Sequence, residues 1–147
     1  MPILTLPIGP EGAVVTIGVG LSLPRAQALH AAGLDVPQPR VIRALIDTGA
    51  SCTAVDAAII QSLGLVPTGT MSIFTPSTGA VPHRCNQYDV AIGILMEAPQ
   101  VYVVPGAIPV IEAHLGAQNY QALIGRDVLG QALLVYNGRA GSLSMAF

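Results

Sequence analysis

Hydrophobic positions along the chain fall into short runs separated by clusters of glycine, proline and serine. This punctuation is typical of strands joined by turns, because those residues favour turns and interrupt regular structure. The runs predict strands at residues 13–19, 41–46, 70–74, 80–85, 89–95, 100–104, 131–136 and 142–147. The pattern therefore indicates an all-β fold.

Three stretches depart from this pattern and predict short helices. Residues 24–32 begin at a proline and stop at a glycine, which are common at the two ends of a helix. They predict a helix within an insertion of about residues 22–38. Asp56 stands in the place of an N-cap before a helix at residues 57–63, and a single helical turn is expected at residues 126–129.

Length and composition narrow the class of protein. The 147 residues fit one domain, which we expect to span residues 1–147. Only 10% of residues are charged, against about 25% in ordinary soluble domains, so part of the surface is expected to be covered by a partner. All six basic residues are arginines and the net charge is -2, which argues against binding nucleic acid or an anionic membrane. No apolar run approaches the ~18 residues of a membrane helix.

The cysteines and the first residues bear on compartment and cofactors. Cys52 and Cys85 are too few and too far apart in sequence for a disulfide framework, and no secretory signal is expected because the first positive side chain is Arg25. Both observations favour a reducing compartment, and we expect a cytoplasmic protein. His83 and Cys85 have a spacing that could present two metal ligands on one strand face, yet two further ligands are missing. We expect no metal and no other cofactor.

One segment carries most of the chemical information. The apolar residues 44–46 (Ala-Leu-Ile) run straight into Asp47, the first residue of the sequence Asp-Thr-Gly-Ala-Ser. The carboxylate is therefore expected at the end of a strand, on the floor of a cleft where the backbone turns away. Residues 122–125 repeat Ala-Leu-Ile and have Gly125 in the position of Asp47, so the two segments predict the two halves of a pseudo-symmetric unit.

The order of these motifs resembles that of the retropepsin-like aspartic proteases. The resemblance rests on Asp-Thr-Gly-Ala-Ser at residues 47–51, a turn sequence at residues 76–79 where a flap is expected, residues 87–90 after it, and Leu-Ile-Gly-Arg-Asp at residues 123–127. It implies a closed β-barrel with short helices and a projecting flap hairpin. It also implies an aspartic endopeptidase that hydrolyses extended, largely apolar peptide segments.

The chemistry of such an enzyme bears on its assembly. Peptide hydrolysis by an uncoordinated water needs one group to take a proton from the water and another to protonate the carbonyl oxygen. Two carboxylates that share one proton can do both, because like charges in contact cannot both ionise cheaply. The chain contains a single Asp-Thr-Gly, and the second copy has Gly125 instead of a carboxylate. A working pair therefore needs Asp47 from two chains, which predicts a homodimer acting on a peptide or protein substrate.

The resemblance also implies roles for residues around the motif. Asp47, Thr48 and Gly49 would form the catalytic centre, and Ala50 and Ser51 would line the cleft. The hairpin would close over the substrate, with a further contact from the second copy of the motif. The residues expected to contact substrate from these parts are Ile73, Phe74, Thr75, Ser77, Gly79, Val81 and Ile124.

Two expectations concern contacts around the site. Ser51 stands where the retroviral members have an acidic residue, so the usual partner of Arg126 must be replaced by Asp127 or by another group. The uncharged tail alternates small polar and apolar residues and would be an aggregation hazard as a free edge strand. We therefore expect residues 142–147 to pair with a symmetry mate in the dimer.

Other interpretations stay open at this point. A dimeric peptide-binding or scaffolding module with the same fold, and with little or no proteolytic activity, would carry the same motifs. Cys52 could be a thiol nucleophile with His83 or His30 as its base, although a small buried hydrophobe is the more common role of a free cysteine. Asp47 could also be a turn aspartate whose side chain caps its own loop.

Overall fold

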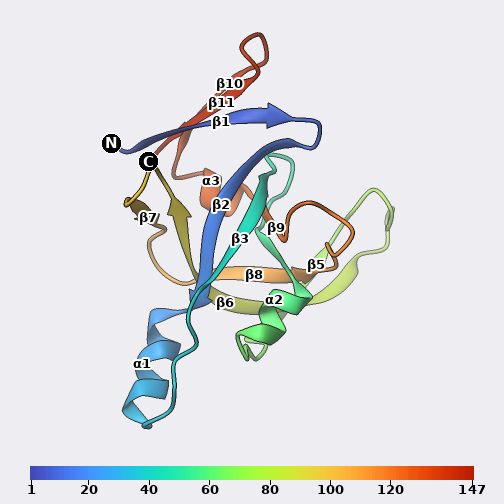
Figure 1. The fold of residues 1–147 in the computed structure, drawn as a ribbon. Coiled ribbons are helices and arrows are strands. Elements are labelled where there is room, and N and C mark those ends of the chain that lie inside the picture. The colour runs from blue at the N-terminus through green and yellow to red at the C-terminus, as the bar shows by residue number, and fades with distance from the viewer.

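The computed structural model describes residues 1–147 and consists mainly of β-strands, with three short helices (Figure 1). The mostly β class predicted from the sequence is confirmed. The strands are β1 (Ile3–Gly9), β2 (Gly12–Leu21), β3 (Arg40–Ile46), β4 (Ala54–Asp56), β5 (Gly69–Ile73), β6 (His83–Leu95), β7 (Val101–Val103), β8 (Ile108–Ala113), β9 (Ala122–Ile124), β10 (Leu133–Asn137) and β11 (Ser142–Ala146). The helices are α1 (Leu23–Ala31), α2 (Ala57–Ser62) and α3 (Arg126–Leu129), and none is long and apolar enough to cross a membrane.

The strands form one sheet in the order β10-β11-β1-β2-β3-β9-β4-β8-β6-β5, with β7 paired to β6. Strand β6 also pairs with β2, so the pairings run in a cycle from β2 through β3, β9, β4, β8 and β6 back to β2. Two pairings in this cycle are parallel, β3 with β9 and β4 with β8, and the others are antiparallel.

The core is built mainly from the strands of this cycle, and it fixes the strands that reach the site. Along β2, Val15, Ile17 and Val19 are almost completely buried, and the residues between them are not. Strand β6 repeats the alternation, with Ile92 and Ile94 fully buried. Because successive side chains of a strand point to opposite faces, this period of two holds both strands in one register against the core.

Several strand predictions need correction. The strands expected at residues 80–85 and 89–95 are one strand, β6, which pairs with β5 near its start, β8 in its middle, and β2 and β7 toward its end. Strands β1, β4 and β8 were not expected, and the residues of β9 were expected only as the second copy of the motif. Pro7 and Pro109 lie within β1 and β8, and proline normally argues against a strand. Strand β4 has three residues, too few to show an alternation.

The expectation for the C-terminal tail is wrong. Strand β11 lies between β1 and β10 of the same chain, so both of its edges are already paired. Leu143 and Met145 are buried in this chain's own core, with exposed fractions of 5% and 0%. The tail has no free edge for a symmetry mate because β1, which the sequence pattern did not reveal, occupies it.

The insertion after β2 stands away from the sheet. Helix α1 forms where the sequence predicts it, with a proline in its first turn and Gly33 just beyond its end in a left-handed conformation (φ 70°). Figure 1 shows α1 projecting from the body of the molecule, and no residue of the helix is buried. The chain returns to β3 through an extended segment without regular structure, residues 34–39.

Candidate active site

The two copies of Ala-Leu-Ile lie side by side. Strands β3 and β9 pair in parallel, with Ala44 opposite Ala122, Leu45 opposite Leu123, and Ile46 opposite Ile124. The chain therefore leaves the sheet at the same level at Asp47 and at Gly125. This in-register pairing agrees with the two halves of a pseudo-symmetric unit that the repeated sequence predicts.

The turn after β3 fixes the carboxylate of Asp47. Its backbone N–H donates to the carbonyl of Ile124 at 3.0 Å, which ties the turn to β9. Its Oδ1 accepts from the backbone N–H groups of Gly49 at 3.0 Å and Ala50 at 3.2 Å. The other carboxylate oxygen, Oδ2, accepts no hydrogen bond from the chain, so it remains available to a water or a second carboxyl group.

Asp47 opens into a cavity of about 430 Å³ between the turn after β3 and the β5–β6 hairpin. The residues that line the cavity away from Asp47 are largely apolar, and none of the lining residues is basic. A concave, mostly apolar space with a few polar groups is typical of a ligand-binding site. The lining residues are Asp47, Gly49, Ala50, Ser51, Cys52, Ala54, Ile73, Phe74, Thr75, Pro76, Ile111 and Leu123.

Seven of the predicted site residues meet in this cavity, and five do not. Those that line it are Asp47, Gly49, Ala50, Ser51, Ile73, Phe74 and Thr75, whereas Thr48, Ser77, Gly79, Val81 and Ile124 lie outside it. Ile124 is fully buried in the core, so the expectation that it walls this cavity needs correction. Because neighbours on a strand face opposite sides, Leu123 takes that place.

Sequence reasoning missed five lining residues. Ala54 lies on β4, Ile111 on β8 and Leu123 on β9. The alternation around Ile124 was a usable signal for Leu123. Ile111 had no such signal, because its strand was not expected. Cys52 and Pro76 adjoin predicted residues in the sequence and complete the wall.

The hairpin that borders the cavity has the predicted form. Strands β5 and β6 pair from Gly69 opposite Gln87 to Ile73 opposite His83, and the loop beyond them projects from the sheet (Figure 1). Thr75 and Thr78 close the turn: the N–H of Thr75 donates to Thr78 Oγ1 at 2.9 Å, and the N–H of Thr78 donates to the Thr75 carbonyl at 3.0 Å.

Gly125 stands where a second aspartate would be needed for a catalytic pair within one chain. A Cβ built at this position would lie 2.5 Å from the carbonyl carbon of Cys52 and 2.6 Å from its oxygen. No real side chain approaches a backbone this closely, so even alanine does not fit. The second copy of the motif therefore has room only for a glycine, and this chain supplies one carboxylate at the paired strand ends.

Arg126 and Asp127 both bond the segment that follows β3, but they do not form an ion pair with each other. The Nη1 group of Arg126 donates to the carbonyls of Thr48 at 2.9 Å and Gly49 at 3.1 Å. Asp127 accepts from the N–H and hydroxyl of Thr53 at 2.9 and 2.7 Å. Arg126 thus contacts backbone oxygens in place of an acidic partner, because Asp127 is already engaged.

Electrostatics argue against a thiol nucleophile. Burial, and secondarily the negative charge of Asp127, raises the pKa of the Cys52 thiol. A catalytic cysteine needs the opposite shift, because the thiolate is the nucleophile. His83, one of its suggested bases, is exposed on the hairpin, and His30 lies on the projecting helix α1. No group of three histidine, cysteine or acidic side chains lies close enough together to hold a metal ion.

Comparisons with known proteins identify the family. A family model described as aspartyl protease matches residues 31–128, a stretch that contains the turn after β3, the hairpin and the second copy of the motif. The chain therefore belongs to the aspartyl protease family. Its fold is similar to that of a retropepsin-like aspartic protease from Rickettsia conorii, with a TM-score of 0.55 and 14% sequence identity over 97% of this chain and 89% of that chain. No curated protein sequence matches this chain.

Proposed function

We propose that this chain is an aspartic endopeptidase that is active as a homodimer, with one Asp47 from each chain in the catalytic pair. The proposal rests mainly on the difference between the residues that follow the paired strands β3 and β9. Asp47 opens into a cavity, whereas Gly125 has no room for a side chain. One chain supplies one carboxylate, so a symmetric dimer is the simplest source of the second.

In the proposed dimer, the two carboxylates share one proton and hold a water between them. The ionised carboxylate takes a proton from the water, which attacks the peptide carbonyl, and the protonated carboxylate gives its proton to the carbonyl oxygen. Each role is worth about 10²–10⁴-fold in rate. The hydrogen bonds from Gly49 and Ala50 to Oδ1 support this mechanism, because they hold Asp47 in one orientation and leave Oδ2 free for the water.

The substrate that fits best is an extended, largely apolar peptide. Ile73, Phe74, Ile111 and Leu123 give the cavity apolar walls, which favours bulky apolar side chains next to the cleaved bond. The hairpin beside Asp47 can bind an extended backbone by adding it as a strand and can exclude water when it closes. We also infer that the cycle of strand pairings is the closed barrel that the family resemblance implies.

The deciding experiment compares wild type with Asp47→Asn on a library of apolar peptides. Asparagine keeps an oxygen for the two backbone donors, so we expect normal folding and assembly, checked by circular dichroism and sedimentation. Cleavage should disappear, and wild-type activity should be highest in mildly acidic solution, where a carboxylate pair holds one proton. Cleavage that survives in Asp47→Asn would assign the reaction to another group.

Dilution tests the dimer separately. The specific activity of the wild type should fall as the concentration drops through the dissociation constant of the dimer, because a monomer has one Asp47. An active monomer would overturn the requirement for two chains. A dimer that binds the peptides without cleaving them would favour the peptide-binding module instead. We further propose a cytoplasmic location, with which two free cysteines are compatible.

A further inference from the structure

A second cavity, of about 650 Å³, lies between the sheet and the insertion that carries α1. It shares no lining residue with the cavity at Asp47, so it is a separate site. Its lining comes from β2, β3, β6 and β7, from Ala26 of α1, and from the return segment at residues 36–39. The size falls in the ~300–1,000 Å³ range of small-molecule sites.

The strand register gives this cavity the shape of a trough. One row of residues runs across four strands, with Val41 opposite Gly18, Gly18 opposite Gly93, and Gly93 opposite Val103. The outer two are valines, exposed by 66% and 65%, and the inner two have no side chains. We call this feature the apolar trough: two valine walls on either side of a floor of bare backbone.

Packing within the chain does not explain why residue 18 is glycine. A Cβ at this position would meet a single atom, the carbonyl oxygen of Gly93, at 4.0 Å. Its φ lies outside the left-handed region, so the backbone does not require glycine either. Gly93 differs, since a Cβ there would lie 2.9 Å from Val101 Cγ1. The missing side chain at Gly18 therefore has one evident effect, which is to keep the trough open.

The insertion covers the trough but buries little of itself: Pro39 packs on Gly20, whereas a Cβ at Gly18 would meet no atom of the insertion within 4 Å. No residue of α1 is buried, and Pro37 is the only residue of the return segment that is not classed as exposed. An insertion of this length normally stabilises itself by burying apolar side chains. An occupant above Gly18 would supply a packing partner that neither the sheet nor the insertion provides there.

The chemistry of the lining selects a neutral hydrocarbon. No charged residue lines the cavity, and Gln38 is its only polar side chain. The floor residues Gly18 and Gly93 lie between paired strands on both sides, so the floor has few free hydrogen-bonding groups. Pro37 and Pro39 carry no N–H in the lip. A buried peptide would leave backbone groups unpaired at a cost of about 1–3 kcal/mol each, whereas a hydrocarbon has none to satisfy.

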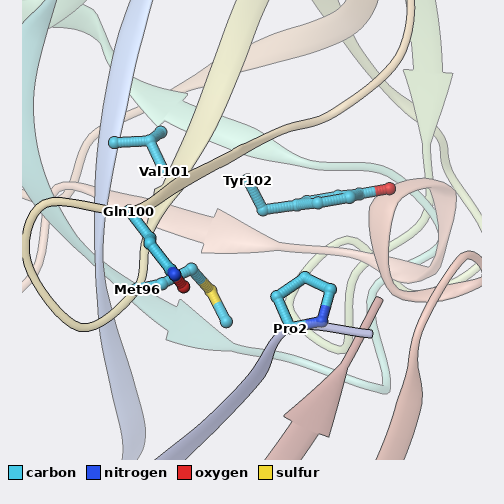
Figure 2. Close-up of a pocket in the computed structure, with 5 residues that line it drawn as sticks. All are labelled: Pro2, Met96, Gln100, Val101 and Tyr102. Atoms are coloured by element: carbon cyan, nitrogen blue, oxygen red, sulfur yellow. The ribbon is translucent and has the colours of Figure 1, made fainter.

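A smaller cavity adjoins the trough at one residue of β7. It measures about 280 Å³, is lined by Pro2, Met96, Gln100, Val101 and Tyr102, and shares Val101 with the trough. Figure 2 shows the side chain of Val101 pointing away from Pro2, whereas the ring of Tyr102 lies across from Pro2. Because neighbouring residues on a strand face opposite sides, the two cavities meet only at Val101, and the trough alone sets the length of its ligand.

From this geometry we propose that the apolar trough binds an uncharged, slender hydrocarbon ligand of the acyl-chain or long-chain alcohol class. The proposal does not depend on proteolysis. The lining carries no charge, which matches an uncharged ligand. The floor has few free hydrogen-bonding groups, which matches a hydrocarbon chain that forms no hydrogen bonds.

The test uses the full chain, the neutral fluorophore N-phenyl-1-naphthylamine and decan-1-ol as competitor. Wild type should enhance the fluorescence saturably at one site per chain, and decan-1-ol should displace the dye. Gly18→Leu should weaken dye binding by about tenfold or more, because its side chain fills the trough that the ligand would occupy. Val103→Asp should do the same by placing a charge in the wall, at a position exposed enough to tolerate it.

Thr16→Leu is the matched control, because it adds the same side chain on the same face of β2, two residues away and outside the lining. It should bind the dye as wild type does, and so should Asp47→Asn. Absence of saturable binding by a folded wild type would overturn the proposal, as would equal binding by Gly18→Leu and Thr16→Leu. Loss of self-association in Val103→Asp, without any dye binding by wild type, would show instead that a second copy covers the trough.

Discussion

Strands β3 and β9 end in the same three residues, but the residue that follows differs: a carboxylate after β3 and a glycine after β9. In both strands Ala-Leu-Ile runs to the edge of the sheet, and the pairs lie in register. Strand β3 then places Asp47 at an open cavity, with Oδ1 held by two backbone donors. Strand β9 places Gly125 against the backbone of Cys52, where a Cβ would come within 2.5 Å.

This difference gives the two copies of the motif different roles. The turn after β3 presents a carboxylate, and the turn after β9 supports it. Arg126 follows Gly125 and reaches the carbonyls of Thr48 and Gly49, and the N–H of Gly125 donates to Thr53 Oγ1 at 3.1 Å. Close approach of the two turns makes these contacts possible, and glycine is what permits the approach.

The largest expected effect, on peptide cleavage, comes from replacing Asp47 by glycine, the residue that the second copy has at the same position. Asp47→Gly removes the proposed base and acid, so peptide cleavage should fall by at least about 10⁴-fold. Stability should fall by only about 1–2 kcal/mol, from two lost hydrogen bonds and a more flexible backbone. Peptide cleavage and urea unfolding measure the two quantities. If Asp47→Gly cleaves at more than a hundredth of the wild-type rate, Asp47 is not catalytic.

The reciprocal test concerns the second copy, and its expected effect is on stability. Gly125→Ala forces a methyl group against the Cys52 carbonyl, which should cost about 1–3 kcal/mol or more in the free energy of unfolding. Gly116→Ala is the matched control, because a Cβ at Gly116 meets nothing within 4 Å and its φ is not positive. Equal unfolding midpoints in urea for the two variants would show that Gly125 is not needed for the close approach.

How far the sequence predicts this site depends on how local each signal is. Asp47 and the repeated Ala-Leu-Ile are local, and so is the turn around Thr75, because a few neighbouring residues define each of them. The partner of Arg126 was not predictable, since it is the backbone of a turn 77 and 78 positions away along the chain. The wall at Ile111 was missed for a similar reason: β8 contains a proline and is recognisable only through its pairing with β4 and β6.

The same distinction explains the error about the tail. Residues 142–147 were correctly expected to form an uncharged strand that needs a partner, but its partner was assigned to another chain. Strand β1 fills that place within the chain, from Ile3 opposite Ala146 to Pro7 opposite Ser142. Which strands pair is decided by contacts between residues far apart in sequence, and a single sequence does not display them.

A smaller effect is expected from the contact that links the two turns. Arg126→Met keeps most of the side-chain length but removes both hydrogen bonds to Thr48 and Gly49. We expect kcat to fall by about tenfold with little change in KM, because the turn that orients Asp47 loosens. The free energy of unfolding should change by less than about 1 kcal/mol, since Arg126 is exposed.

Arg139→Met serves as the control for this variant, because Arg139 is exposed in the turn between β10 and β11 and its side chain makes no hydrogen bond or ion pair. It should retain wild-type kcat. A tenfold loss of kcat in Arg139→Met as well would indicate a general effect of the lost positive charge rather than a role of Arg126 in positioning the turn after β3.

The smallest effect concerns Cys52, whose backbone lies against Gly125 of the second copy and which lines the cavity at Asp47. Burial raises the pKa of its thiol, and the charge of Asp127 adds to the shift, so at neutral pH the folded protein holds less thiolate than an unburied cysteine would. Alkylation of Cys52 by iodoacetamide should therefore be slower than that of glutathione at pH 7, and its rate should rise with pH to a midpoint above that of glutathione. Peptide mapping by mass spectrometry separates Cys52 from the buried Cys85. Fast alkylation of Cys52 at neutral pH, with loss of cleavage in proportion, would contradict this expectation and would reopen the thiol as a nucleophile, because only a readily formed thiolate could act in that role.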